Sequence, residues 1–414
     1  MDTMLSGARA MRVFLCFACG YFLSYALRSI NAVIAPALMQ EMDLSNADLG
    51  LLSSAYFVSF AAMQLPLGIW LDKYGPRRTE TALLLGAAIG AAVFASSTSL
   101  AGLWVGRALI GAGVSACLMA AFKAYRQWFP IEQQSQLASW MLVAGTSGAL
   151  SATVPVTAAL PLIGWRAIFW IFSVLILIAA AAIFFLLQDI EHRFESSAAN
   201  KTPPHANNGG YRRIFASPYF RRMALIGMAH QGVFIALQTL WIGPWMTTVL
   251  GKSQQETAQI LLLFNFGLML SYLGLGWWAP RLLARADWSL NRVIGVGIGG
   301  MLVAQGAMLL IAAPWAWVLW LLLALCVTVT TLVQTHVGLA FPAALTGRAN
   351  AAYNLMLFIG AFGAQWGIGL LIDGFKTYGA STSDALRAAF AVCLLAQAAA
   401  LVGFLFNRAQ PEHT

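Results

Sequence analysis

Charged residues are scarce in this sequence. Only 9% of its 414 residues are Asp, Glu, Lys or Arg, whereas soluble domains carry about 25%. Residues 293–347 contain none of the four, and hydrophobic residues make up 60% of the chain. These proportions exclude a soluble globular protein and predict a protein that is embedded in a membrane.

Cysteine is also rare, and clusters of catalytic residues are missing. The five cysteines are Cys16, Cys19, Cys117, Cys326 and Cys393, and all lie in apolar stretches. We interpret Cys16 and Cys19 as small helix-packing residues, because a metal or redox site would need a second ligand pair. No Ser-His-Asp set, paired carboxylates or metal-ligand cluster occurs at a suitable spacing. We therefore expect no enzyme activity, no cofactor and no bound metal.

Long apolar runs dominate the chain instead. A membrane-spanning helix needs about 20 apolar residues, and charges, prolines and turns divide the chain into twelve such stretches. They lie near residues 12–38, 47–71, 79–97, 100–124, 134–160, 165–187, 220–249, 257–280, 292–312, 315–340, 349–373 and 385–407. Residues 293–347 would measure about 80 Å as one helix, so we expect a turn at residues 313–315. The predicted fold class is an all-α membrane protein with twelve transmembrane helices.

Basic residues are distributed unevenly over the loops. If the N-terminus is cytoplasmic, 17 of the 24 Lys and Arg residues are cytoplasmic, four lie in outer loops and three lie within spans. This bias is the positive-inside pattern, and an even number of spans places both termini in the cytoplasm. We expect a protein of the bacterial inner membrane whose net charge of +9 faces lipid head groups, with no role for nucleic acid.

Residues 188–219 interrupt the apolar pattern with charged residues, prolines and glycines. This composition cannot form a core, so we interpret the segment as a cytoplasmic linker between two six-helix domains, residues 1–187 and 220–414. The two halves also resemble each other. Phe-Pro at 129–130 precedes a Gly-x-x-Gly at 145–148, and Phe-Pro at 341–342 precedes another at 360–363. Secondary transporters build their binding sites from such internal repeats.

The turn after the second apolar stretch carries the sequence GIWLDKYGPRR at residues 68–78, and RALIGAG follows at residues 107–113. These motifs resemble two signatures of the major facilitator superfamily, whose members fold into two pseudo-symmetric six-helix bundles. The resemblance implies a transporter that works by alternating access, and we expect a monomer. The residues that it assigns to gating are Gly68, Asp72, Lys73, Gly75, Arg77, Arg78 and Arg107.

The chemistry of this turn agrees with a gate. Gly75 permits a tight turn, and Asp72 has a charge that is favoured at a helix N-terminus. Lys73, Arg77 and Arg78 are expected at lipid phosphates. The resemblance implies that Asp72 docks on the start of span eleven, near residues 348–350. The alternative interpretation is a basic turn that only sets orientation, and Arg107 is interpreted as a packing or gating residue.

Arg28 lies deep in the first apolar stretch. A charge at such a depth costs about 2.5 to 3.5 kcal/mol and persists mainly beside a cavity or a partner. With Tyr25, it resembles the first span of the organic-anion branches of the superfamily, the organophosphate:phosphate antiporters and the anion:cation symporters. There an Arg binds a phosphate or carboxylate through its planar fork. Lys123 is either a second basic ligand or a lysine that reaches the cytoplasmic interface.

Two departures from those branches narrow the substrate. Gln64 stands where the antiporters have a Lys, and span seven contains no Arg. A phosphate dianion would lack its second cation, so we expect a ligand with one negative charge, such as a carboxylate. Polar and aromatic residues at helical spacing are expected on cavity-facing sides of spans two, seven and eleven. The candidates are Tyr56, Gln64, His230, Gln238, Trp241, Asn354 and Phe358.

Acidic residues constrain the coupling. We place all 15 Asp and Glu, including Glu80, in loops, tails or span ends. Since proton carriers usually need a titratable group in the membrane, only His230 or the substrate's own carboxylate is expected to carry a proton. This favours exchange, or movement of an anion with a proton, over a carboxylate relay.

The predicted function is secondary active transport of a small organic anion, as proton-coupled symport or as exchange. The main alternative is a multidrug or amphiphile exporter of the same fold, for example of a siderophore. A third hypothesis is a ligand sensor that keeps the fold without transporting. Cation-drug pumps usually carry an acid in the first spans, whereas Arg28 is basic.

Overall fold

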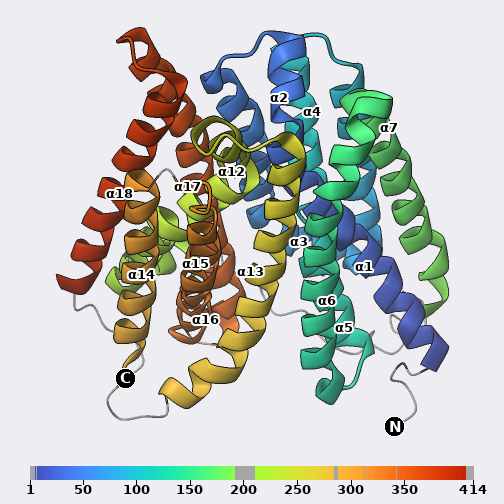
Figure 1. Cartoon of the computed structure of the whole chain (residues 1–414). Helices are drawn as coiled ribbons and strands as arrows, with labels where there is room; N and C mark the ends of the chain where they lie inside the picture. The colour runs from blue at the N-terminus through green and yellow to red at the C-terminus, as the bar shows by residue number, and fades with distance from the viewer. Residues whose placement is uncertain are drawn as a thin grey trace. The chain divides into compact units, whose positions relative to one another are not determined.

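The computed structural model describes residues 5, 7–191, 210–283, 288–311, 313–341 and 343–406, and regular secondary structure in these ranges is entirely helical (Figure 1). Up to residue 191 the helices are α1 (Gly7–Ser29), α2 (Asn31–Met42), α3 (Asn46–Ser96), α4 (Leu100–Gly113), α5 (Cys117–Trp128), α6 (Ile131–Ser151) and α7 (Val154–Leu186). Residues 188–191 are helical as well.

From residue 210 onward the elements are α9 (Gly210–Ala216), α10 (Pro218–Gly227), η1 (Met228–Gly232), α11 (Val233–Ala236), η2 (Leu237–Trp241), α12 (Ile242–Pro244), η3 (Trp245–Val249), α13 (Gln254–Leu283), α14 (Leu290–Leu310), α15 (Val318–Val327), η4 (Thr328–Thr330), α16 (Thr331–Leu339), α17 (Ala343–Thr377) and α18 (Thr382–Phe406). The segments η1, η2 and η3 are π-helical, and η4 is a 3-10 turn.

These helices follow the apolar stretches of the sequence. Among the described residues, eleven helical segments are long and apolar enough to cross a membrane, and α6 adds a helix of 21 residues over the expected fifth span. Residues 313–317 form the expected turn between α14 and α15. The prediction of an all-α membrane fold is confirmed.

Two glycines divide long helices. Gly75 in α3 has a φ of 77°, and Gly164 in α7 has a φ of 72°. Glycine adopts this left-handed region without the clash that a Cβ atom causes. Each of the two therefore marks the turn between two expected spans. The first apolar stretch is divided too, because α1 ends at Ser29 and α2 begins at Asn31.

The chain forms two compact units. The first consists of Met1–Ile30 and Val58–Asn207, and the second of Asn31–Phe57 and Asn208–Thr414. In the first unit α1 packs along α6 and contacts α5, and in the second α14 packs on α15 and α18 (Figure 1). Helix α2 packs on η2 and α12 within the second unit. The division of the sequence into residues 1–187, 188–219 and 220–414 stays a prediction, and residues 192–209 of that linker lie outside the described ranges.

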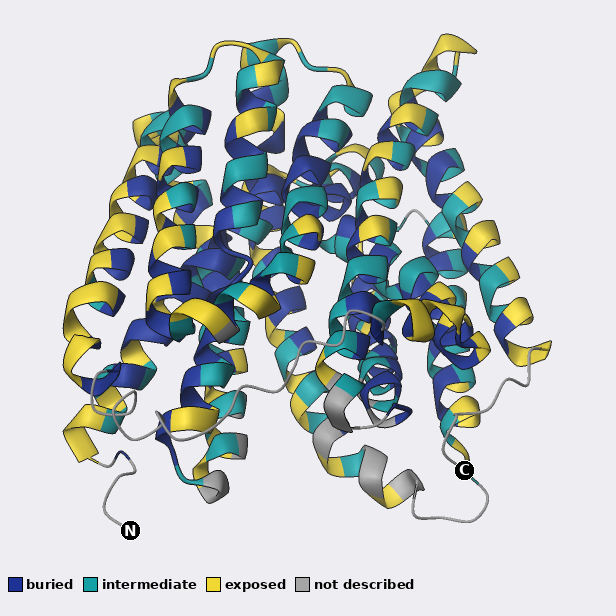
Figure 2. Cartoon of the chain, turned by 180° about the vertical axis from the view of Figure 1, so that it is seen from behind, coloured by how far each residue is buried: buried dark blue, intermediate teal, exposed yellow. Residues whose placement is uncertain are grey.

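Many large apolar side chains are exposed. Figure 2 shows buried and exposed positions alternating along the long helices. On α7 the exposed residues include Trp170, Val174, Ile178 and Phe185, at intervals that keep them near one side of the helix. An exposed face this apolar is unfavourable in water and fits contact with lipid.

Candidate functional site

Arg28 lies in the last turn of α1, in the first unit. The central carbon of its guanidinium group is 4.7 Å from the centre of the Tyr25 ring and 5.5 Å from that of Phe60. Tyr25 lies one turn earlier on the same helix, and Phe60 comes from α3. Aromatic faces stabilise a cation without neutralising it, and the N–H donors of a guanidinium lie in its own plane. This arrangement keeps both the charge and a planar set of donors at the end of α1.

Arg107 braces the same end of α1. It is buried in α4, and its Nη1 donates a hydrogen bond of 3.1 Å to the carbonyl of Leu27. The last carbonyls of a helix lack intrahelical donors, so Arg107 supplies one directly beside Arg28. Its guanidinium also lies 5.5 Å from the ring centre of Phe94. This geometry supports a packing role that positions Arg28.

Lys123 and Gln64 contact backbone in the first unit. The Nζ atom of Lys123 on α5 lies 2.7 Å from the carbonyl oxygen of Leu71 on α3. The buried Gln64 bonds the carbonyl of Phe60 on its own helix at 3.4 Å. The contact of Lys123 is the one expected of a lysine that anchors the end of a span. The role of Lys123 as a substrate ligand or as an anchor stays a prediction.

In the second unit, Tyr56 and Phe358 come together around Phe57. The Phe57 and Phe358 rings are stacked with centroids 5.9 Å apart, and the Tyr56 ring meets Phe57 edge to face at 5.2 Å. Asn354, one turn before Phe358 on α17, accepts a hydrogen bond of 3.0 Å from Gln334 of α16. These candidates form a polar and aromatic contact of α3, α16 and α17.

The candidates of span seven contact three different helices, and their place on a cavity-facing side stays a prediction. Their neighbours differ: His230 meets Gln397 of α18, Gln238 donates to Asn265 of α13, and Trp241 donates to the carbonyl of Gln365 of α17. The cause is the three π-helical segments. A π turn holds one more residue than an α turn, so each segment rotates the following side chains away from the 3.6-residue pattern.

His230 is fully buried in the second unit. Its side chain is 0% exposed, and it lies among the helices of the second unit beside the Gln305 and Gln397 pair. These two amides bond each other at 3.2 and 2.9 Å. The surroundings are those of a buried polar contact between helices. They give no support to the expectation that His230 sets the pH dependence.

The turn at Gly75 is built around a buried ion pair. The Nε atom of Arg77 lies 2.5 Å from Oε2 of Glu191, and both side chains are only 4% exposed. Arg77 also donates to the carbonyl of Phe184 at 2.7 Å, and Arg78 reaches the same carboxylate at 3.8 Å. A Cβ atom on Gly75 would lie 2.8 Å from Oε1 of Glu191, so the glycine also leaves room for the carboxylate.

This ion pair corrects one expectation for the basic turn. Arg77 does not reach lipid phosphates, because the carboxylate of Glu191 holds it inside the protein. Lys73 and Arg78 are exposed, as expected of residues at a membrane surface. Gly68 has no atom within 4 Å of an added Cβ. The side chain of Asp72 lies outside the described part of the chain, and its docking on span eleven stays a prediction.

The other end of α3 carries a second contact between a charge and a helix end. Asp373 of α17 accepts hydrogen bonds from the backbone N–H of Ala47 at 2.6 Å and of Asn46 at 3.3 Å. It also accepts one from the Asn46 side chain at 2.9 Å. Free N–H groups and the helix dipole favour a carboxylate at this place. Sequence reasoning placed Asp373 at a span end and gave it no role.

Glycines bring the same helices together. An added Cβ on Gly50 would lie 2.5 Å from the carbonyl oxygen of Gln365, and one on Gly369 would lie 2.3 Å from that of Asn46. Nearby, a Cβ on Gly243 of α12 would lie 2.3 Å from the carbonyl oxygen of Ala32 on α2. Pro36, four residues after Ala32 on α2, has no N–H group that could donate to that carbonyl. These helices therefore meet backbone to backbone.

Glu80, which the sequence places at one end of the third span, is enclosed by protein. It is 0% exposed and lies within the apolar helical segment Lys73–Ser96. The helix resumes directly after Gly75, so Glu80 is already more than a turn inside. A Cβ on Gly20 of α1 would lie 2.8 Å from its Oε1 atom. The sequence showed an acid near a basic turn, and it did not show that a glycine of another helix makes room for it.

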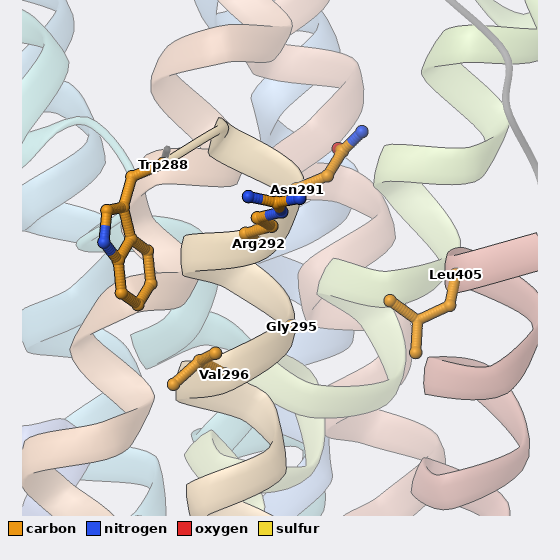
Figure 3. A pocket seen from close by; sticks show the side chains of 6 residues that line it. All are labelled: Trp288, Asn291, Arg292, Gly295, Val296 and Leu405. Carbon is orange, nitrogen blue, oxygen red and sulfur yellow. The ribbon is translucent and has the colours of Figure 1, made fainter. Parts of the chain in front are cut away.

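A surface hollow of about 520 Å³ lies at the start of α14, away from these groups. Figure 3 shows its lining, which is Trp288, Asn291, Arg292, Gly295, Val296 and Leu405. Trp and Arg at the end of an apolar helix are typical of the membrane interface. The hollow contains none of the predicted site residues, and we interpret it as part of that interface.

Known proteins resemble this chain at the level of sequence. Residues 17–365 match the family model of the Major Facilitator Superfamily. The hexuronate transporter of Escherichia coli (strain K12) is 32% identical over 167 residues, which are 39% of this chain and 38% of that protein. The match thus spans well under half of that relative. The 4-hydroxybenzoate transporter PcaK of Pseudomonas aeruginosa is 26% identical over 96% of this chain and 93% of its own length.

A solved structure shows the same fold. The crystal structure of a bacterial homolog of the human lysosomal transporter Spinster, inward-facing and unoccupied, matches with a TM-score of 0.76. The alignment covers 97% of each chain at 16% identity. Because the family model matches residues 17–365, which are most of the chain, the chain belongs to the Major Facilitator Superfamily.

Proposed function

We propose that this transporter moves a small organic anion with one carboxylate across the bacterial inner membrane by alternating access. The observation that carries the proposal is Arg28, whose charge is kept beside Tyr25 and Phe60 at the end of α1. A guanidinium in this setting suits the two oxygens of a carboxylate. Arg107 supports it by fixing the carbonyl of the preceding residue.

The relatives support the class of substrate. One is a hexuronate transporter and another a 4-hydroxybenzoate transporter. Hexuronate and 4-hydroxybenzoate each carry one carboxylate and at least one hydroxyl group. Gln64 stands in place of a second cation, and Lys123 is bonded to a backbone carbonyl. The first unit is therefore suited to bind a ligand with one negative charge.

The remaining parts of the proposal concern the transport cycle. We propose two six-helix halves joined by a cytoplasmic linker, both termini in the cytoplasm, and a monomer as the working unit. The turn at residues 68–78 and the contact of Asp373 with the start of α3 act as gates at opposite ends of the second span. The anion moves either with a proton or in exchange for a second anion.

The test is a ligand panel on purified protein, followed by uptake into vesicles. Glucuronate, 4-hydroxybenzoate, a dicarboxylate, a phosphate ester and a lipophilic cation are compared by their effect on the melting temperature. A ligand that binds the folded state raises this temperature by mass action. We expect the monocarboxylates to stabilise most and to accumulate in vesicles. Stabilisation by the cation alone would support the exporter instead, and binding without uptake would support the sensor.

A further inference from the structure

Glu80 is a carboxyl group enclosed by protein within a membrane segment. Neither of its oxygens accepts an N–H or O–H hydrogen bond. Within the part of the chain that the structure describes, Glu80 takes part in no ion pair. The basic residue nearest along its own helix face, Arg77, is already paired with Glu191.

The groups that face Glu80 from the helices packed against it are neutral. Among the cations of these helices, Arg12 pairs with Asp189, Arg28 lies over the Tyr25 ring, and Lys123 donates to the carbonyl of Leu71. Helix α1 contributes Gly20, against which Oε1 lies, and the thiol of Cys16. Helix α5 contributes the thiol of Cys117 and the phenol of Tyr125. Thiols and phenols are ordinarily neutral at pH 7. The carboxyl group therefore faces neutral groups from both helices.

An ionised carboxylate is very unfavourable in such surroundings, and the group becomes neutral by taking up a proton. The enclosed conformation therefore holds Glu80 as the carboxylic acid. Water that enters the contact of α1, α3 and α5 in another conformation would lower the cost of ionisation and let the proton leave. A site that binds a proton when closed and releases it when hydrated has the property that a proton-coupled transporter needs.

Glu80 is also connected to Arg28 through α1. Cys117, which lies against the Glu80 carboxyl, is within electrostatic reach of Arg28. The Tyr21 and Tyr25 rings, 4.9 Å apart, occupy α1 between Gly20 and Arg28. An ionised Glu80 would compete with a substrate anion for the Arg28 charge, whereas a protonated Glu80 would not. Proton and anion are thus expected to bind together.

We infer that Glu80 is the proton-binding site of this transporter, and that its protonation removes a negative charge that would compete with the anion for Arg28. This inference rests on the proposed function and decides between its two forms in favour of symport with about one proton per anion. It also assigns the pH dependence to Glu80 rather than to His230.

The first experiment needs no substrate. Infrared spectra of the purified protein are recorded between pH 5 and 10 for wild type, Glu80→Gln and Glu41→Gln. Gln copies the size of the neutral acid, so the variant should fold, and Glu41 is an exposed acid of α2. We expect a carbonyl band of a protonated carboxylic acid that fades as pH rises in wild type and in Glu41→Gln, and that is missing in Glu80→Gln. A band that persists in Glu80→Gln, or one that never fades in wild type, would overturn the inference.

The second experiment counts protons during binding. Calorimetry with glucuronate and with 4-hydroxybenzoate, in buffers of different ionisation enthalpy, gives the number of protons taken up with the anion. Wild type is expected to take up about one, with affinity falling up to about tenfold per pH unit above the carboxyl's pKa. Glu80→Gln should bind both probes without proton uptake. Equal proton uptake in the two proteins would refute the role of Glu80. Failure of wild type to bind either probe would count against the proposed function alone, because the infrared experiment tests Glu80 without a substrate.

Discussion

Single residues deal with buried charge in three ways in the first unit. Arg77 and Glu191 neutralise each other in a direct ion pair. Arg28 and Arg107 keep their charges on aromatic faces, and Glu80 is enclosed by neutral groups. The first arrangement stabilises a turn. We propose that the second presents the Arg28 charge to an anion, and we infer that the third favours a bound proton.

The ion pair gives a prediction for stability. Glu191→Gln leaves the Arg77 charge buried without its partner, and breaking a buried pair costs about 3 to 5 kcal/mol. Asp189→Asn is the matched control, because its pair with Arg12 is exposed and should contribute at most about 1 kcal/mol. We expect a much lower melting temperature for Glu191→Gln than for Asp189→Asn. Equal melting temperatures would show that the turn does not depend on this pair.

For single residues, the sequence indicated which charged residues are unusual, but it did not indicate which groups they contact. Depth in an apolar stretch was enough to single out Arg28. The partner of Arg77 is 114 residues away, and a contact across that distance depends on the fold. Glu80 was assigned to a span end for the same reason, since the space that Gly20 leaves for it belongs to another helix.

Among the elements, α3 is held at its start by α17 through close backbone contact and through the Asp373 carboxylate. The backbone contact depends on glycines and the carboxylate contact on a helix end. The periodicity of apolar residues predicts neither of them. The boundaries of most spans followed from that periodicity. The neighbours of the span-seven candidates did not, because three π-helical segments change the rotation per residue.

Gly50→Ala tests the backbone contact. The new Cβ atom would lie 2.5 Å from the Gln365 carbonyl oxygen, and overpacking of this kind costs about 1 to 3 kcal/mol. Gly86→Ala, in the part of α3 after Gly75, is the control, since no atom lies within 4 Å of its added Cβ. The control should gain up to about 1 kcal/mol from helix propensity. Melting temperatures that move in opposite directions would confirm the contact, and a stabilised Gly50→Ala would contradict it.

Asp373→Asn tests the charge at the start of α3. The variant keeps the size of the side chain but loses a charge–dipole interaction of about 0.3 to 1 kcal/mol, or up to about 2 when partly buried. Hydrogen exchange of the amides at residues 46–50 should become faster. Asp384→Asn, whose acid bonds Ser381 before α18, should leave these amides unchanged. Unaltered exchange in Asp373→Asn would remove its role as a gate.

For the whole molecule, composition and motifs were sufficient to predict the class. Few charges, twelve apolar stretches and the motif at residues 68–78 predicted a member of the Major Facilitator Superfamily, and the family match confirms it. Composition says little about the substrate, because a single arginine among apolar helices is compatible with many anions. The substrate class therefore depends on Arg28 and on the relatives that resemble this chain.

The most direct test of this account is the binding of glucuronate and 4-hydroxybenzoate to wild type, Arg28→Lys and Arg28→Ala. Arg9→Ala serves as the control, since Arg9 is an exposed arginine of the same helix. Hydrogen bonds to charged groups contribute about 1.5 to 3 kcal/mol each, so Arg28→Lys should bind roughly ten- to a hundredfold more weakly. Arg28→Ala should lose binding, and Arg9→Ala should bind as wild type does. Normal anion binding by both Arg28 variants, or a preference of the wild type for cations, would contradict the account.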